Sequence, residues 1–253
     1  MIALHKIKLS RAQLDGIPEH ERRLFILVSH ASNELNVLSK LFHFTASATS
    51  DVDVVVKAEN IQAVVLGRLL TGKIYECWML LKSSFFGTAL SKKYEPQFDE
   101  IASQSLQTLK RYFSHENIIA GVRNHHAFHY SPEQVDAGYR SLIDEDPLDI
   151  YLSESNANTL YEFADNIIGR AMLEGILPGD HERAFGKLID DTASAVKNLN
   201  IVIGAIMTVC LHTYIGNNLN EMGAEIVQIE GVPESQQVYI PYFVEIDNSD
   251  VNV

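Results

Sequence analysis

The chain of 253 residues is long enough for one large domain or two modest ones, with a sizeable hydrophobic core. Hydrophobic residues make up 46% of it and charged residues 21%, as in an ordinary soluble globular protein. The net charge of −13 at pH 7 argues against a protein that coats nucleic acid electrostatically, although a locally basic motif could still bind one phosphate or a short single strand.

Three features of the sequence predict a cytoplasmic protein. The first residues lack the basic and apolar regions of a signal peptide. Cys77 and Cys210 both lie in apolar stretches, and we expect them to be buried thiols in a reducing compartment and not a disulfide. The most apolar run, residues 201–211, is far shorter than the ~20 residues that a membrane span requires, so we expect no membrane as a partner.

The first part of the chain has the periodicity of packed helices. An apolar stripe at three- and four-residue steps predicts a helix that begins near Pro18 and packs in a bundle. The stripe consists of Leu24, Val28, Ala31, Leu35, Leu38 and Phe42. The small and β-branched residues 44–56 predict a loop. A second helix is expected over about residues 58–86, and a third follows Pro96 over residues 98–113.

Residues 123–130 have the sequence Arg-Asn-His-His-Ala-Phe-His-Tyr, which places one guanidinium, one amide, three imidazoles and a phenol within eight residues. They follow an apolar run, residues 118–122, which we expect to form a fourth helix capped by residues 114–117. Ser131 and Pro132 then have the pattern of an N-cap and a first helical residue, so a fifth helix begins there. Polar side chains from both helices can therefore converge at this junction.

The second part of the chain continues as helices and ends in an acidic segment. Residues 144–158 are acidic and rich in Ser and Asn. Helical spacing then predicts helices over about residues 159–174 and 181–215. Residues 225–229 and 238–244 alternate as strands do, around a turn that contains Gly and Pro, and they predict a β-hairpin.

Arg123-Asn124 followed by His129 resembles the Arg, polar residue, gap, His signature of the HEPN superfamily (higher eukaryotes and prokaryotes nucleotide-binding). The local phrase is most similar to helical HEPN proteins of abortive-infection and toxin systems, and the resemblance covers about residues 20–145. It implies a helical bundle, often a homodimer, whose motif lines a cleft. It also implies metal-independent endoribonuclease activity, although other members of the superfamily have lost catalysis.

The chemistry of RNA cleavage assigns roles to these side chains. It needs a base for the 2′-hydroxyl proton, an acid for the 5′-oxygen and positive charge on the phosphate. His129 suits the base or the acid, Arg123 suits the phosphate, and Asn124 could orient either of them. On a continuing helix His126 shares a face with Arg123, which makes His126 the second candidate for proton transfer, while His125 is expected to be solvated.

Arg123 and His129 are six residues apart, a spacing that an ideal helix would not bring together. Either the helix loosens before His129 or the two side chains meet across a dimer interface.

The same histidines have two other interpretations, as a surface turn without chemistry and as a metal site. Histidine-rich turns are common on protein surfaces without any chemistry. His125 and His129 have the i,i+4 spacing of a helical metal site, but no HExxH pattern or nearby acidic ligand accompanies them. We therefore expect neither a metal ion nor a cofactor.

The sequence as a whole predicts an all-α protein. Residues 1–147 are expected to form an up-and-down helical bundle of HEPN type that carries the Arg-Asn-x4-His motif. Residues 148–253 are expected to form a helical extension and a small acidic C-terminal hairpin that pack on the bundle. Residues 221–253 contain seven acidic residues and no Lys or Arg, and the simplest explanation is that these charges keep the protein soluble.

Two functions remain open from the sequence. The first is a metal-independent endoribonuclease of toxin or phage-defence type that cleaves single-stranded RNA as a homodimer, with an antitoxin as a further candidate partner. The alternative is a non-catalytic HEPN dimer module that binds a nucleotide, RNA or a protein partner. The intact motif favours the enzyme, and the acidic composition and the unexplained second half favour the module.

Overall fold

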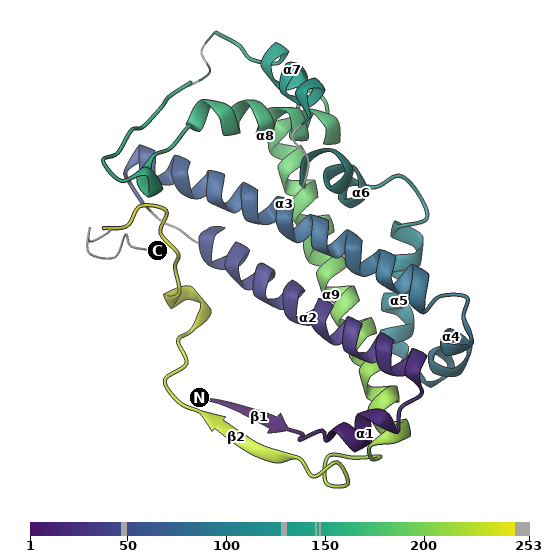
Figure 1. The fold of residues 1–253 in the computed structure, drawn as a ribbon. Helices are drawn as coiled ribbons and strands as arrows, with labels where there is room; N and C mark the ends of the chain where they lie inside the picture. Colours follow the sequence, from purple (N-terminus) through teal and green to yellow (C-terminus); the bar gives the residue numbers. More distant parts are fainter. Residues whose placement is uncertain (47–49, 128–130, 145, 147, 246–253) are drawn as a thin grey trace. The chain divides into compact units, whose positions relative to one another are not determined.

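The computed structural model describes residues 1–46, 50–127, 131–144, 146 and 148–245, which are mostly helical, as predicted (Figure 1). The helices are α1 (Arg11–Asp15), α2 (Glu19–Ala46), α3 (Asp53–Ser84), α4 (Ala89–Tyr94), α5 (Glu100–Tyr112), α6 (Ile118–Val122), α7 (Pro132–Arg140), α8 (Glu162–Ile176) and α9 (His181–Tyr214). The strands are β1 (Ile2–Lys6) and β2 (Glu225–Ile229). A π-helical turn, Arg123–Ala127, continues α6.

The longer helices begin and end within a few residues of the predicted positions, because their apolar periodicity is strong. The predicted loop over residues 44–56 is shorter than expected, since α2 extends to Ala46 and α3 begins at Asp53. Ser131 caps α7 as predicted and accepts a hydrogen bond from the Gln134 amide at 3.4 Å. The sequence did not predict α1, α4 or β1, which are short.

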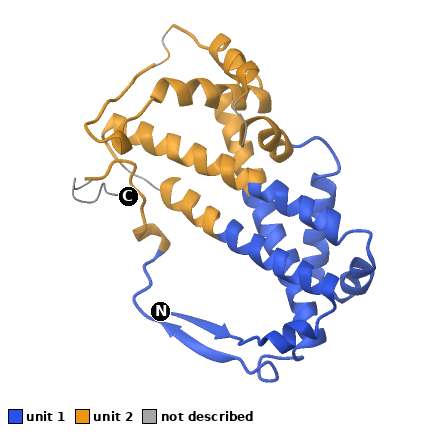
Figure 2. Ribbon diagram, viewed as in Figure 1, with its two compact units in different colours: residues 1–36, 73–117, 193–234 blue, residues 37–72, 118–192, 235–253 orange. Residues whose placement is uncertain are grey.

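The chain forms two compact units, and both are discontinuous in sequence (Figure 2). Unit 1 comprises residues 1–36, 73–117 and 193–234, and unit 2 comprises residues 37–72, 118–192 and 235–253. The boundaries fall inside α2, α3 and α9, so each of these helices contributes a segment to each unit. The predicted division of the chain at residue 147 stays a prediction.

Unit 1 has an apolar core with one buried ionic group. Trp78 of α3 stacks on Phe113 with ring centroids 4.6 Å apart, and Cys77 and Cys210 are buried free thiols, as expected. The buried Glu21 accepts hydrogen bonds from Tyr94 at 2.5 Å and from Lys93 at 3.0 Å. Burial acts to raise the pKa of Glu21, but these hydrogen bonds outweigh it and hold the pKa below its ordinary value.

The predicted C-terminal β-hairpin is wrong. β2 pairs antiparallel with β1, in a register that sets Ile2 opposite Ile229, and residues 238–244 form no strand. Pro241 lies in the middle of that segment and has no amide proton for a strand ladder. The segment is instead held to unit 2 by tyrosines: Tyr239 donates to Glu59, and Tyr242 donates to the Thr159 carbonyl at 2.9 Å.

Unit 2 depends on a close contact between α7 and α8. A Cβ atom built on Gly138 of α7 would lie 2.1 Å from the Ile167 carbonyl oxygen of α8, so only glycine permits this approach. Val122, Met172 and Leu188 form an apolar cluster that joins α6, α8 and α9. Together these contacts fix the end of α6 and the start of α7 against α8.

α9 as a whole differs from the sequence-based expectation, which found no apolar stretch long enough to span a membrane. By length and composition it could cross a membrane, and it is the single such helix among the described residues. Its apolar window is 39% buried within the protein, and the core helix of a soluble protein passes the same test of length and composition. The structure is therefore compatible with a soluble protein.

Candidate functional site

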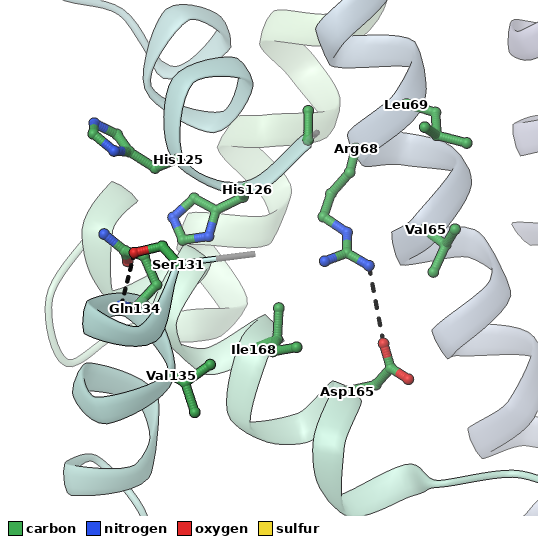
Figure 3. A pocket seen from close by; sticks show the side chains of 11 residues that line it. Val65, Arg68, Leu69, His125, His126, Ser131, Gln134, Val135, Asp165 and Ile168 are labelled. Carbon is green, nitrogen blue, oxygen red and sulfur yellow. Dashed lines mark hydrogen bonds and ion pairs between the residues drawn. The ribbon is translucent and has the colours of Figure 1, made fainter. Parts of the chain in front are cut away.

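Unit 2 contains a cavity of about 420 Å³ lined by α3, the π-helical turn, α7 and α8 (Figure 3). We call it the arginine–histidine cavity. Its polar lining consists of Arg68, His125, His126, Ser131, Gln134 and Asp165. Alanine, valine, leucine and isoleucine side chains form the rest of its described wall. A concave site with a few convergent polar groups on an apolar wall is the usual form of a ligand site.

The π-helical turn determines which side chains of the motif face this cavity. Hydrogen bonds in a π turn join residues five apart, so the turn holds more residues than an α turn, and residues three apart no longer share a face. His126 therefore lines the cavity, whereas Arg123 and Asn124 are absent from its lining. The shared face of Arg123 and His126 was predicted for a helix that continues regularly, and the π-helical turn does not meet that condition.

The cation of the cavity is Arg68. Its side chain is 17% exposed, and its Nη2 atom lies 3.9 Å from the Asp165 carboxylate of α8. At that separation the ion pair orients the guanidinium without a direct hydrogen bond, so the donors of Arg68 remain available to a ligand. Burial raises the pKa of Asp165, and the charge of Arg68 opposes this shift.

His126 is the imidazole most perturbed by its surroundings. Burial lowers its pKa to about 4, and the neighbouring His125 and the charge of Arg68 act in the same direction. Figure 3 shows the His126 ring and the Arg68 guanidinium on facing sides of the cavity. At neutral pH the described lining of the cavity therefore places a fixed cation, Arg68, opposite the neutral imidazole of His126, which can accept a proton.

The start of α7 supplies the remaining polar atoms. Ser131 and Gln134 line the cavity, and the Ser131 hydroxyl also donates to Glu133 at 2.7 Å. His125 is exposed, as expected, but it also lines the cavity, which the prediction of a solvated residue without a role did not anticipate.

The predicted site residues thus divide into three groups. His126 lies in the cavity. Arg123 and Asn124 lie outside its lining, and Arg123 Nη1 donates to Asn124 Oδ1 at 3.2 Å. His129 lies outside the described residues. The catalytic roles assigned to these side chains stay predictions.

Arg68 and Asp165 belong to the cavity but were missed in the sequence. A signal for Arg68 existed, because it is the one charged residue in the apolar stretch of residues 61–72. A buried arginine in such a stretch needs a partner, and the sequence alone does not show that α8 supplies one. Asp165 carried no comparable signal.

Comparisons of the chain with protein-family models, with curated proteins and with solved structures found no match. Among the described residues no three His, Cys, Asp or Glu side chains come together as metal ligands would.

Proposed function

We propose that this chain is a metal-independent endoribonuclease of toxin or phage-defence type that cleaves single-stranded RNA in the arginine–histidine cavity. One observation carries the proposal: the guanidinium of Arg68 and the neutral imidazole of His126 face the same cavity. A guanidinium binds phosphate through parallel hydrogen bonds, and an imidazole accepts a proton near neutral pH. These are two of the three groups that the cleavage of RNA requires.

The reaction would use the RNA's own 2′-hydroxyl as the nucleophile. Arg68 holds the phosphate, and His126 takes the proton of the 2′-hydroxyl as its oxygen attacks phosphorus. The bond from phosphorus to the 5′-oxygen breaks, and an acid gives a proton to that oxygen. The products are a 2′,3′-cyclic phosphate and a 5′-hydroxyl. His129, which the sequence predicts as either base or acid, would be the acid in this scheme. The sequence assigns the phosphate to Arg123 and its orientation to Asn124, and here Arg68 takes the first of these roles.

The low pKa of His126 suits this role once a substrate is bound. An anion beside an imidazole favours the charged form and so raises its pKa. A phosphate on Arg68 would therefore move the pKa of His126 up from about 4 towards neutrality, where general-base catalysis is most efficient. The imidazole would thus become a stronger base when the phosphate arrives.

We further infer that the protein acts in the cytoplasm as a homodimer, with an antitoxin as a candidate partner. The described lining of the cavity holds a single guanidinium, and a second copy of the chain could bring further cations to a bound strand. A symmetric pair is the commonest oligomer. Light scattering should then report twice the 28.3 kDa of one chain. A mass of one chain across micromolar concentrations would contradict the dimer.

The test of the activity is RNA cleavage by the purified protein in EDTA. Wild type should leave 2′,3′-cyclic phosphate ends on a single-stranded oligonucleotide. His126→Ala and His129→Ala should each slow the reaction by about 10²–10⁴-fold, as the loss of a general acid or base does. His115→Ala removes an exposed imidazole of unit 1 and should have no effect. Equal rates for wild type and His126→Ala, or cleavage that depends on Mg²⁺, would contradict the proposal.

The second candidate function is a non-catalytic module that binds RNA, a nucleotide or a protein partner. It is favoured by the position of Arg123 and Asn124, which contact each other instead of lining the cavity with His126. In the same assay such a module would bind the oligonucleotide and leave it intact.

A further inference from the structure

A second cavity, of about 300 Å³, lies beside the arginine–histidine cavity in unit 2. α3 and α8 line both cavities, and Asp165 belongs to both linings. On α3, Val64 lines the second cavity and the next residue, Val65, lines the first. A ligand held by Arg68 could therefore extend from one cavity into the other.

The charges around the second cavity exclude a second phosphate. Its lining holds two fixed cations, Lys57 and Arg170, and both are already paired. Lys57 lies within 3.3 Å of carboxylate oxygens of Asp53, Asp149 and Glu162, and Arg170 pairs with Asp146. With Asp165 and its partner Arg68, three cations meet five carboxylates, an excess of two negative charges that repels an anion.

The remaining lining suits a flat, uncharged ring with polar edges. Ile61, Val64 and Leu173 offer apolar walls to the faces of such a ring. Asn60 is exposed, and its side-chain amide has no hydrogen-bond partner among the described residues, so it can donate to and accept from a ring edge. Apolar walls with a few placed polar groups are the usual form of a small-ligand site, and hydrogen bonds to the edges of an unpaired base give such a site specificity.

We propose that the second cavity holds the nucleobase of the nucleotide whose phosphate Arg68 binds. This inference rests on the proposed function, because it takes phosphate binding in the arginine–histidine cavity as given. Asn60 and Arg68 are eight residues apart on α3, roughly 12 Å along the helix axis. That separation is comparable to the length of an extended mononucleotide. A base held in a cavity also requires an unpaired strand, which agrees with the single-stranded substrate of the proposed function.

The test compares inorganic phosphate with the four nucleoside monophosphates by calorimetry on the full chain. A base held against apolar walls should make at least one mononucleotide bind roughly tenfold more tightly than phosphate. Gly169 of α8 lines the second cavity, and no atom lies within 4 Å of a Cβ built on it. Gly169→Leu should therefore fill the cavity and abolish this tenfold gain, while phosphate itself binds as before.

Three further variants complete the test. Gly175→Leu lies on the same helix outside both linings and should keep the gain. Asn60→Leu should reduce the gain and change which base binds best, whereas Asn33→Leu, an exposed asparagine of α2 in unit 1, should do neither. Circular dichroism checks that each variant is folded.

The outcomes separate the two proposals. Phosphate binding without any gain from a base overturns the nucleobase site and leaves the proposed function standing. A gain that survives in both Gly169→Leu and Asn60→Leu also overturns the nucleobase site. If neither phosphate nor any mononucleotide binds, both proposals fail.

Discussion

His126 stays neutral where an exposed histidine would begin to protonate, because burial and two neighbouring groups oppose a charge on its ring. Arg68 instead carries its charge within an apolar stretch of α3. The carboxylate of Asp165, 3.9 Å away, offsets the cost of burying that charge. Groups with a shifted pKa, such as His126, gather at functional sites, and His126 and Arg68 line one cavity. The proposed function rests on this pairing of a fixed cation with a neutral base.

The depressed pKa of His126 predicts how stability depends on pH. The folded-state pKa of about 4 lies below the ordinary value of 6.5, so the unfolded chain binds the proton more readily. The contribution is fully present above about pH 6.5 and is lost as the pH falls towards 4. Between pH 7 and pH 4, wild type should lose roughly 2 kcal/mol more unfolding free energy than His126→Gln.

Urea unfolding at several pH values measures this difference. His115→Gln, which removes an exposed imidazole, should follow wild type at every pH. If wild type and His126→Gln lost stability in parallel, the imidazole would not be buried in its neutral form.

At the scale of elements, the π-helical turn and the contact between α7 and α8 build the cavity. The turn directs His126 into the cavity and leaves Arg123 outside its lining. The α7–α8 contact sets the position of Ser131 and Gln134. Both features depend on local backbone geometry.

Gly138→Ala tests the α7–α8 contact. Its new methyl group would meet the Ile167 carbonyl oxygen, so the helices must separate, and overpacking of this kind costs about 1–3 kcal/mol. Phosphate binding should weaken as well, because one wall of the cavity moves. Gly175→Ala on α8 has open space around its Cβ and should be neutral or stabilising by up to about 1 kcal/mol. If urea unfolding gave the two variants the same free energy of unfolding, the close α7–α8 contact would not contribute to stability.

The elements also show what the sequence can predict. The stripe from Leu24 to Phe42 and the Ser131 cap are local signals, and the structure has the helices that they indicate. The partner of β2 is not local, because β1 lies more than 200 residues away in the chain. The lining of the cavity was only partly predictable from local sequence. His126 belongs to a local motif, whereas the role of Arg68 becomes apparent only when the fold brings Asp165 of α8 beside it.

At the scale of the whole molecule, charge limits the substrates that the protein can bind. A chain with a net charge of −13 repels a long duplex, which needs many cations along its surface. The acidic C-terminal segment adds to this repulsion, although Glu225 pairs with Lys8 at 2.8 Å. By our proposals, affinity then comes from one phosphate in the arginine–histidine cavity and one base in the second cavity. This limit is consistent with a single-stranded substrate and not with a duplex.

The most direct test of the central claim is the single-turnover rate of RNA cleavage in EDTA by Arg68→Ala. Removing a group that stabilises charge in the transition state costs about 10²–10³-fold, and we predict a loss of that size. Arg11→Ala, which removes a guanidinium whose side chain is 94% exposed, should cleave at the wild-type rate. A folded Arg68→Ala protein that cleaves RNA as fast as wild type would contradict the account.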